Sequence, residues 1–137
     1  MEHPFYFLDP RWERSPGGTW YWQRLRSVRE AVGDRRVGNL SKRLMCVDFI
    51  AYHSRRYPNV PVTLSSQHFG FELVRRAIKL SRVIVIGRGA RLWKIAVPEL
   101  AGYEYAFELK NPRSAYISER GLGERCFAAV VEALSAR

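Results

Sequence analysis

The chain is poor in the residues that build crosslinked or metal-bound folds. It has only two cysteines, Cys46 and Cys126, and three histidines among 137 residues. Two cysteines are too few for a disulfide framework, and the histidines lack metal-site spacing, so we expect no metal. No apolar run approaches the roughly 18 residues of a membrane-spanning helix, so we expect no membrane partner. The N-terminus lacks the basic segment of a signal peptide, which predicts a cytoplasmic protein.

Acidic residues are scarce relative to basic ones. The chain has 23 Lys and Arg against 13 Asp and Glu, a formal net charge of +10. Residues 75–94 carry seven cations and no acid, whereas residues 95–137 hold five cations and six acids. A basic region beside a nearly neutral one is typical of nucleic-acid-binding proteins, and we expect a nucleic-acid partner. The alternative is a solvated basic surface without a partner.

The length predicts one domain over residues 1–137, with an N-terminal part at 1–40 and strand–helix repeats at 41–137. In the N-terminal part we expect a short extended piece at 3–10 and a helix capped by Thr19. Apolar runs and alternation predict three strands, at 44–51, 83–86 and 103–110. Helices are expected at 65–81, capped by Ser65 or Ser66, between Gly89 and Pro98, and after Ser118. This order predicts an α/β fold, a three-layer α/β/α domain with a short, mainly parallel sheet of three or four strands.

Ligands of parallel sheets bind beyond the carboxyl ends of the strands, and this rule selects three segments. The first is residues 52–57, where Tyr52 can stack on a base while Arg55 and Arg56 reach phosphates. His53 in the same segment titrates near neutral pH and is a candidate general acid or base. The alternative is a polar loop anchored by Tyr57.

The second segment is Gly87-Arg88-Gly89, a glycine turn between a strand and a helix. Exposed backbone N–H groups and the charge of Arg88 predict a phosphate site. The alternative is a tight turn that needs glycine for its dihedral angles, with an exposed arginine.

The third segment is Asn111-Pro112-Arg113-Ser114, which follows the last predicted strand. Asn111 can donate and accept hydrogen bonds, so it can read a base edge or hold a water molecule. Alternatively, Asn-Pro simply begins a turn. Asp9 would join these segments if residues 3–10 form a strand; its carboxylate could activate water, or it could cap the turn at Pro10.

Taken together, these segments resemble the uracil-DNA glycosylase superfamily over about residues 40–135. Residues 83–90 are similar to the family's apolar strand followed by Gly-basic-x-Ala at a helix start. Residues 111–114 look like the family's second motif, His or Asn followed by Pro, whose loop enters the DNA minor groove. Residues 44–53 are placed like the strand that leads to the family's base-reading pocket.

The resemblance implies a nucleic-acid-binding domain whose partner is DNA rather than RNA and which, if active, acts on a flipped-out base. Asp9 would position water, His53 and Asn111 would contact the base or the developing charge, and Arg88 and Arg113 would hold phosphates. The family's glycine-rich first motif is reduced to Asp9-Pro10 here. The chain therefore resembles a divergent, N-terminally shortened member. Either Asp9 is a degenerate first motif, or the first strand–helix unit has been lost together with the catalytic water site, while the nucleic-acid surface remains.

The resemblance leaves catalysis open. One alternative is a non-catalytic binding or interaction module that keeps the fold, and another is an enzyme acting on a small phosphorylated ligand held by residues 87–89. No cofactor is expected, because two cysteines exclude the iron–sulfur cluster of some branches of the family.

Overall fold

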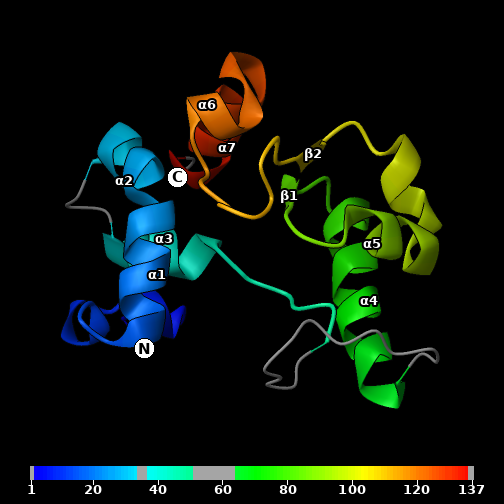
Figure 1. Cartoon of the computed structure of the whole chain (residues 1–137), viewed down its shortest axis with the longest axis horizontal. Coiled ribbons are helices and arrows are strands. Elements are labelled where there is room, and N and C mark those ends of the chain that lie inside the picture. The colour runs from blue at the N-terminus through cyan, green and yellow to red at the C-terminus, as the bar shows by residue number, and fades with distance from the viewer. Residues whose placement is uncertain (1, 34–36, 51–63, 136–137) are drawn as a thin grey trace.

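The computed structural model of the chain describes residues 2–33, 37–50 and 64–135. The chain forms a small, mostly helical α/β fold with a two-stranded parallel sheet (Figure 1). The helices are α1 (Pro16–Arg24), α2 (Arg26–Val32), α3 (Val37–Arg43), α4 (Ser65–Lys79), α5 (Ala90–Ala96), α6 (Glu119–Leu122) and α7 (Glu124–Ser135). The described strands are β1 (Ile84–Ile86) and β2 (Ala106–Glu108), and the described 3-10 helices are η1 (Tyr6–Leu8), η2 (Pro10–Trp12) and η4 (Pro98–Gly102).

The sheet pairs β1 with β2 in parallel, with Ile84 opposite Ala106 and Ile86 opposite Glu108. The pairing extends beyond the strand, since the Leu109 N–H donates to the Ile86 carbonyl at 3.0 Å. α5 and η4 connect the two strands. The predicted apolar strand at 83–86 and the parallel pairing of the two last strands are therefore confirmed.

Side chains of the sheet alternate between two core clusters. Val85, Phe107 and Leu109 pack in the first cluster, whereas Ile84 and Ile86 pack in the second. The buried residues of the first cluster come from both chain ends: Leu8, Leu25, Val28, Val32, Val37, Leu40, Leu109, Leu122 and Val130. Those of the second cluster come from α4, β1, α5 and η4: Phe71, Val74, Ile86, Trp93, Val97 and Leu100. The period of two along a strand thus places helical residues against both faces of the sheet.

The first helix starts earlier than the sequence predicts. Ser15, not Thr19, is the N-cap, and its Oγ accepts from the Gly18 N–H at 3.0 Å. Pro16 occupies the first helical position, where its missing N–H costs nothing. A Cβ at Gly18 would collide with the Trp12 carbonyl, so glycine lets the helix start pack closely on η2. Residues 16–18, which precede the predicted cap Thr19, are therefore the first turn of α1.

Two other segments also differ from expectation. Residues 3–10, expected to be extended, contain η1 and the first residue of η2. The predicted strand at 44–51 is absent over its described part, residues 44–50. There the Phe49 carbonyl accepts from Gln67 Nε2 at 2.9 Å, so a side chain of α4 takes an acceptor that a strand partner would need.

Of the serine N-caps expected for the later helices, the one at α4 is missing and the one at α6 is present. α4 has no cap from Ser65 or Ser66; Gln67 Oε1 instead accepts from the Leu64 N–H at 2.7 Å. Ser118 is a cap as predicted, accepting from the Gly121 N–H at 3.0 Å, but the last helix expected after it is divided into α6 and α7. Gly123, with φ of +89°, separates α6 from α7. Over the described ranges, no helix has the length and apolar character needed to cross a membrane.

Candidate nucleic-acid interface

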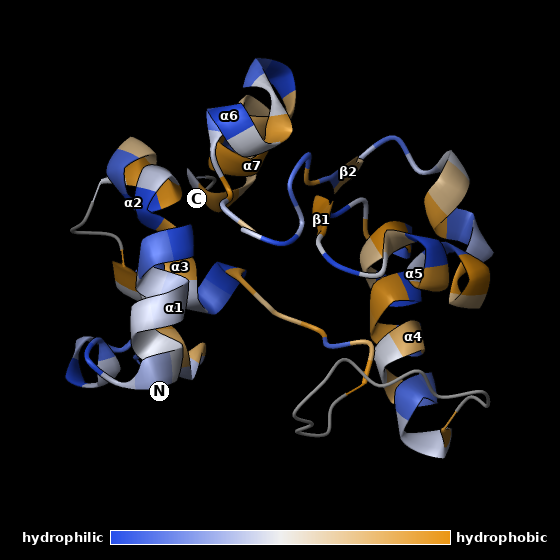
Figure 2. Cartoon of the chain, in the orientation of Figure 1, coloured by the Kyte–Doolittle hydropathy of each residue, from blue (hydrophilic) through white to orange (hydrophobic). Residues whose placement is uncertain are grey.

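Two of the three segments selected by sequence meet at one edge of the sheet. Residues 87–89 follow β1, and residues 110–114 follow β2. Because Ile86 lies opposite Glu108 in a parallel pair, both segments leave the sheet at its carboxyl edge. We call residues 87–89 and 110–114 the strand-end edge. Figure 2 shows these segments as largely hydrophilic, next to the apolar strands they follow.

The turn after β1 depends on one glycine. Gly89 has φ of +75°, a left-handed conformation that suits glycine, and it is the N-cap of α5. A Cβ at Gly87 would make only an ordinary contact, 3.9 Å from Leu109 Cδ1. The requirement of the turn for glycine is thus confirmed at Gly89, and the turn leaves Arg88 exposed.

The turn after β2 is closed by Asn111. Its Oδ1 accepts from the Ser114 N–H at 3.3 Å, and its carbonyl accepts from the Ala115 N–H at 3.1 Å. These bonds confirm that Asn111 begins a turn. Pro112 and Arg113 lie at its exposed tip.

The strand-end edge carries positive charge that the neighbouring acids leave uncompensated. Arg88, Lys110 and Arg113 are exposed, and within the described ranges none of them forms an ion pair. The carboxylate of Glu108, at the end of β2, pairs instead with Lys94 of α5 at 3.1 Å.

Two other acids near α4 and α5, Glu72 and Glu99, also form ion pairs, both of them with Arg75. Glu72 lies 2.8 Å and Glu99 3.5 Å from Arg75, and the hydrogen bond that Arg75 donates to Glu72 raises the pKa of Arg75. The pairing of these carboxylates leaves the three cations of the strand-end edge available to an anionic ligand.

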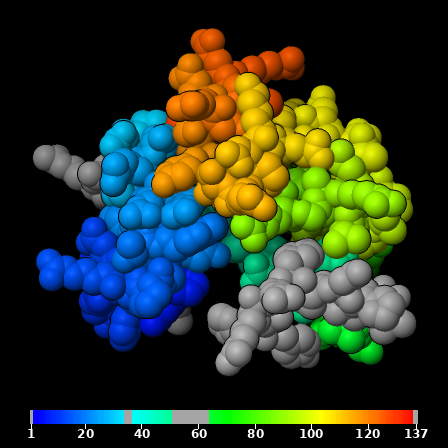
Figure 3. Space-filling model, viewed as in Figure 1, coloured from blue at the N-terminus to red at the C-terminus, as the bar shows by residue number. Residues whose placement is uncertain are grey.

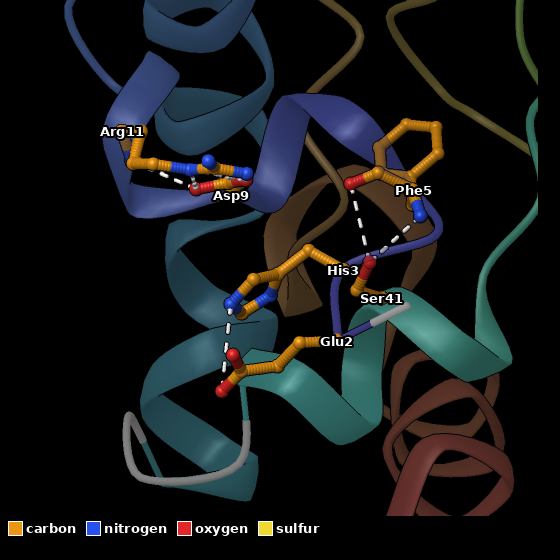
Figure 4. Close-up of polar contacts among 6 residues, drawn as sticks. All are labelled: Glu2, His3, Phe5, Asp9, Arg11 and Ser41. Atoms are coloured by element: carbon orange, nitrogen blue, oxygen red, sulfur yellow. Dashed lines mark hydrogen bonds and ion pairs between the residues drawn. The ribbon is translucent and has the colours of Figure 1, made fainter.

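Asp9 lies elsewhere and serves a different purpose (Figure 4). Its carboxylate accepts from the Arg11 backbone N–H at 2.9 Å and from Arg11 Nη2 at 2.6 Å. These bonds lower the pKa of Asp9 from 3.8 to about 2, the side-chain bond contributing most. Asp9 is the N-cap of η2, which confirms that it caps the turn at Pro10.

The expectation that Asp9 joins the strand-end residues is not met, because residues 3–10 do not form a strand of the sheet. η1 and η2 lie in the N-terminal part of the molecule, separated from β1 and β2 in Figure 1. A bidentate partner two residues away also leaves little of this carboxylate for a water molecule.

The remaining predicted site residues are Tyr52, His53, Arg55 and Arg56, and they lie outside the described residues. In the described portion of the chain, no three His, Cys, Asp or Glu side chains gather in a way that could hold a metal ion.

Sequence reasoning missed an aromatic group beside the strand-end edge. The guanidinium carbon of Arg24 lies 4.8 Å from the ring centre of Trp20 and 5.0 Å from that of Tyr116. The spacing of Trp20 and Arg24, four residues apart on one helix, is a signal that could have found this pair. Nothing local predicts that Tyr116 joins them.

Comparison with known proteins adds no relationship: no protein-family model matches the chain, and no curated protein and no solved structure matches it.

Proposed function

We propose that the chain binds nucleic acid, DNA in the first instance, through the strand-end edge. The observation that carries this proposal is the convergence of two turns, 21 or more residues apart in sequence, on one edge with three exposed cations that pair with no acid among the described residues. Arg88, Lys110 and Arg113 would contact phosphate oxygens, which position a nucleic acid without reading its sequence. The net charge of +10 adds long-range attraction to the same partner.

A glycosylase-like, three-layer arrangement is the finer form of this proposal. It is supported by helical residues packing on both faces of the parallel pair. It is also supported by Gly87-Arg88-Gly89-Ala90 and Asn111-Pro112 leaving the same edge. In such a domain a flipped-out base would lie at the strand-end edge, next to Asn111.

Base excision is a second candidate function, favoured by the exposed position of Asn111 beside Arg88 on this edge. Asp9 takes no part in it, since Arg11 occupies its carboxylate. Base release from uracil-containing oligonucleotides, measured for the wild type beside Asn111→Ala, tests this candidate.

The binding proposal predicts that Arg88→Gln and Arg113→Gln each weaken DNA binding several-fold. Each variant should also reduce the slope of log affinity against log salt by about 1, because one phosphate contact is lost. Fluorescence anisotropy with labelled single-stranded and duplex DNA over a range of salt concentrations measures both quantities.

Arg82→Gln is the matched control. Arg82 is also an exposed arginine without an ion pair among the described residues, but it precedes β1. It lies roughly 20 Å from Arg88 along an extended chain, toward the amino edge of the sheet. The affinity of the Arg82→Gln variant for DNA, and the dependence of that affinity on salt, should match those of the wild type. Equal losses in Arg82→Gln and Arg88→Gln would show that only overall charge matters, and absence of binding by the wild type would refute the function.

A further inference from the structure

The Trp20–Arg24–Tyr116 cluster joins two segments that are far apart in the chain. Trp20 and Arg24 belong to α1, whereas Tyr116 follows the turn at the end of β2. Arg24 Nε donates to the Ser114 carbonyl at 3.1 Å, and the Ile117 N–H donates to the Arg24 carbonyl at 3.1 Å. These two bonds fasten the end of α1 to the segment that leaves the strand-end edge.

The cluster is exposed although its members are held in place. Trp20 is 41% exposed and Tyr116 is 45% exposed. The ring of Trp20 packs in a T-shaped arrangement with that of Tyr21, a partly buried residue against the first core cluster, with ring centres 4.9 Å apart. Gln23 Oε1 accepts from Arg24 Nη1 at 3.0 Å and helps to fix the guanidinium. Trp20 is held on α1, and Tyr116 follows a turn that is hydrogen-bonded to Arg24. Both rings can therefore contact a ligand with little further loss of side-chain freedom.

The position of the cluster makes it continuous with the strand-end edge. Ser114, whose carbonyl binds Arg24, is the last residue of the turn that begins at Asn111. In the space-filling view of Figure 3, the orange residues after β2 lie between the blue of α1 and the yellow-green of the β1–α5 segment. A strand bound by the phosphate contacts of Arg88 and Arg113 would therefore pass close to Trp20 and Tyr116.

The chemistry of the cluster fits an unpaired base. An exposed indole and phenol offer π faces on which any base can stack, and a neighbouring guanidinium adds a cation–π contribution. Bases inside a duplex already stack on one another, so only a single strand or an extruded base can use such a surface.

We propose that Trp20, Arg24 and Tyr116 form a stacking site for an unpaired base of a single-stranded nucleic acid bound at the strand-end edge. This inference rests on the proposed function and adds a preference for unpaired bases to it.

The test compares Trp20→Ala with Trp12→Ala in binding a short oligothymidylate. Trp12 is the matched control, because it is also 41% exposed but packs on Tyr6, away from Arg24. Trp20→Ala should weaken binding of the oligothymidylate by roughly ten-fold or more. Trp20→Phe should recover most of that loss, since it keeps a π face. Trp12→Ala should bind like the wild type.

Two further probes separate stacking from general loss of structure. An abasic strand of the same length offers phosphates without bases, so its weak binding should be the same for the wild type and Trp20→Ala. Duplex binding should also be nearly unchanged. Stacking on Trp20 should quench tryptophan fluorescence when the oligothymidylate binds, and this quenching should decrease in Trp20→Phe but persist in Trp12→Phe.

The outcomes distinguish the inference from the function on which it rests. If Trp20→Ala binds oligothymidylate like the wild type while Arg88→Gln does not, the stacking site is refuted and nucleic-acid binding stands. An equal loss by Trp20→Ala on the oligothymidylate, the abasic strand and the duplex also refutes stacking. If the wild type binds none of these probes, the proposed function itself is refuted.

Discussion

Asp9 shows how one residue can couple the stability of this chain to pH. Its carboxylate takes four hydrogen bonds from Arg11, and its pKa falls from 3.8 to about 2 on folding. A group whose pKa is lower in the folded state stabilises that state above its unfolded pKa, and the contribution disappears as pH falls through the folded pKa. We therefore predict that Asp9→Asn lowers the free energy of unfolding at neutral pH, and that its deficit shrinks between about pH 4 and pH 2.

Asparagine is a suitable replacement because it still caps a helix but carries no charge. The measurement is urea unfolding, followed by circular dichroism, of both proteins at a series of pH values. The difference between them is the quantity to follow, because other carboxylates titrate in both. A deficit that stays constant down to pH 2 would contradict the ion pair.

The role of a site residue could be predicted from the sequence when its hydrogen-bond partner lies only a few residues away. The roles of Asp9, Asn111 and Ser118 as caps or turn starters follow from bonds to residues two to three positions away. The Trp20–Arg24–Tyr116 cluster depends on a bond between Arg24 and Ser114, which are 90 residues apart. Only the folded chain brings such residues together.

At the level of elements, the starts of α1 and α4 allow a comparison between a serine that caps its helix, Ser15, and one that does not, Ser65. Ser15 Oγ accepts from the Gly18 N–H, whereas Ser65 makes no such bond although sequence rules favour it as a cap. Ser15→Ala should lower the free energy of unfolding by about 1 kcal/mol. Ser65→Ala should change it by no more than about 0.5 kcal/mol, as an exposed substitution without a lost partner.

Chemical denaturation of the two variants beside the wild type checks this prediction. An equal loss in both would mean that α4 is capped by serine after all. A loss in Ser65→Ala alone would contradict the start of α1 at Pro16.

The hydrophobic pattern of the sequence predicted β1 and α4 correctly. It failed for residues 44–50, whose conformation depends on the segments that pack against them. The apolar run at 83–86 forms β1, and the helix predicted at 65–81 forms as α4, although its buried face includes Phe71 and Val74 and leaves Phe69 exposed. Residues 44–50 have the same apolar character, but Val47 and Phe49 pack on the second core cluster without forming a strand. Burial explains the apolar run in all three cases, and burial alone does not require β-structure.

At the scale of the molecule, the two-stranded sheet joins two core clusters that could otherwise unfold separately. Leu8 in the first cluster and Val97 in the second are both fully buried, at 0% exposure. Neighbouring residues of one strand, Val85 and Ile86, belong to different clusters. Loss of either cluster would therefore expose one face of the sheet, and we expect the described chain to unfold as one cooperative unit.

Leu8→Ala tests this coupling, because it opens a cavity in the first cluster only. It should lower the free energy of unfolding by about 2–5 kcal/mol. The amides to follow by hydrogen exchange are those of Leu25 and Val97, the C-caps of α1 and α5, which donate to the carbonyls of Tyr21 and Trp93 at 2.9 and 2.8 Å. Under cooperative unfolding both should lose protection by the same factor, roughly thirty-fold or more for 2 kcal/mol. Leu92→Ala, at a 39% exposed leucine on α5, should leave both nearly unchanged. If Leu8→Ala weakens protection at Leu25 but spares Val97, the sheet does not couple the clusters, and the strand-end edge would rest on two parts that open independently.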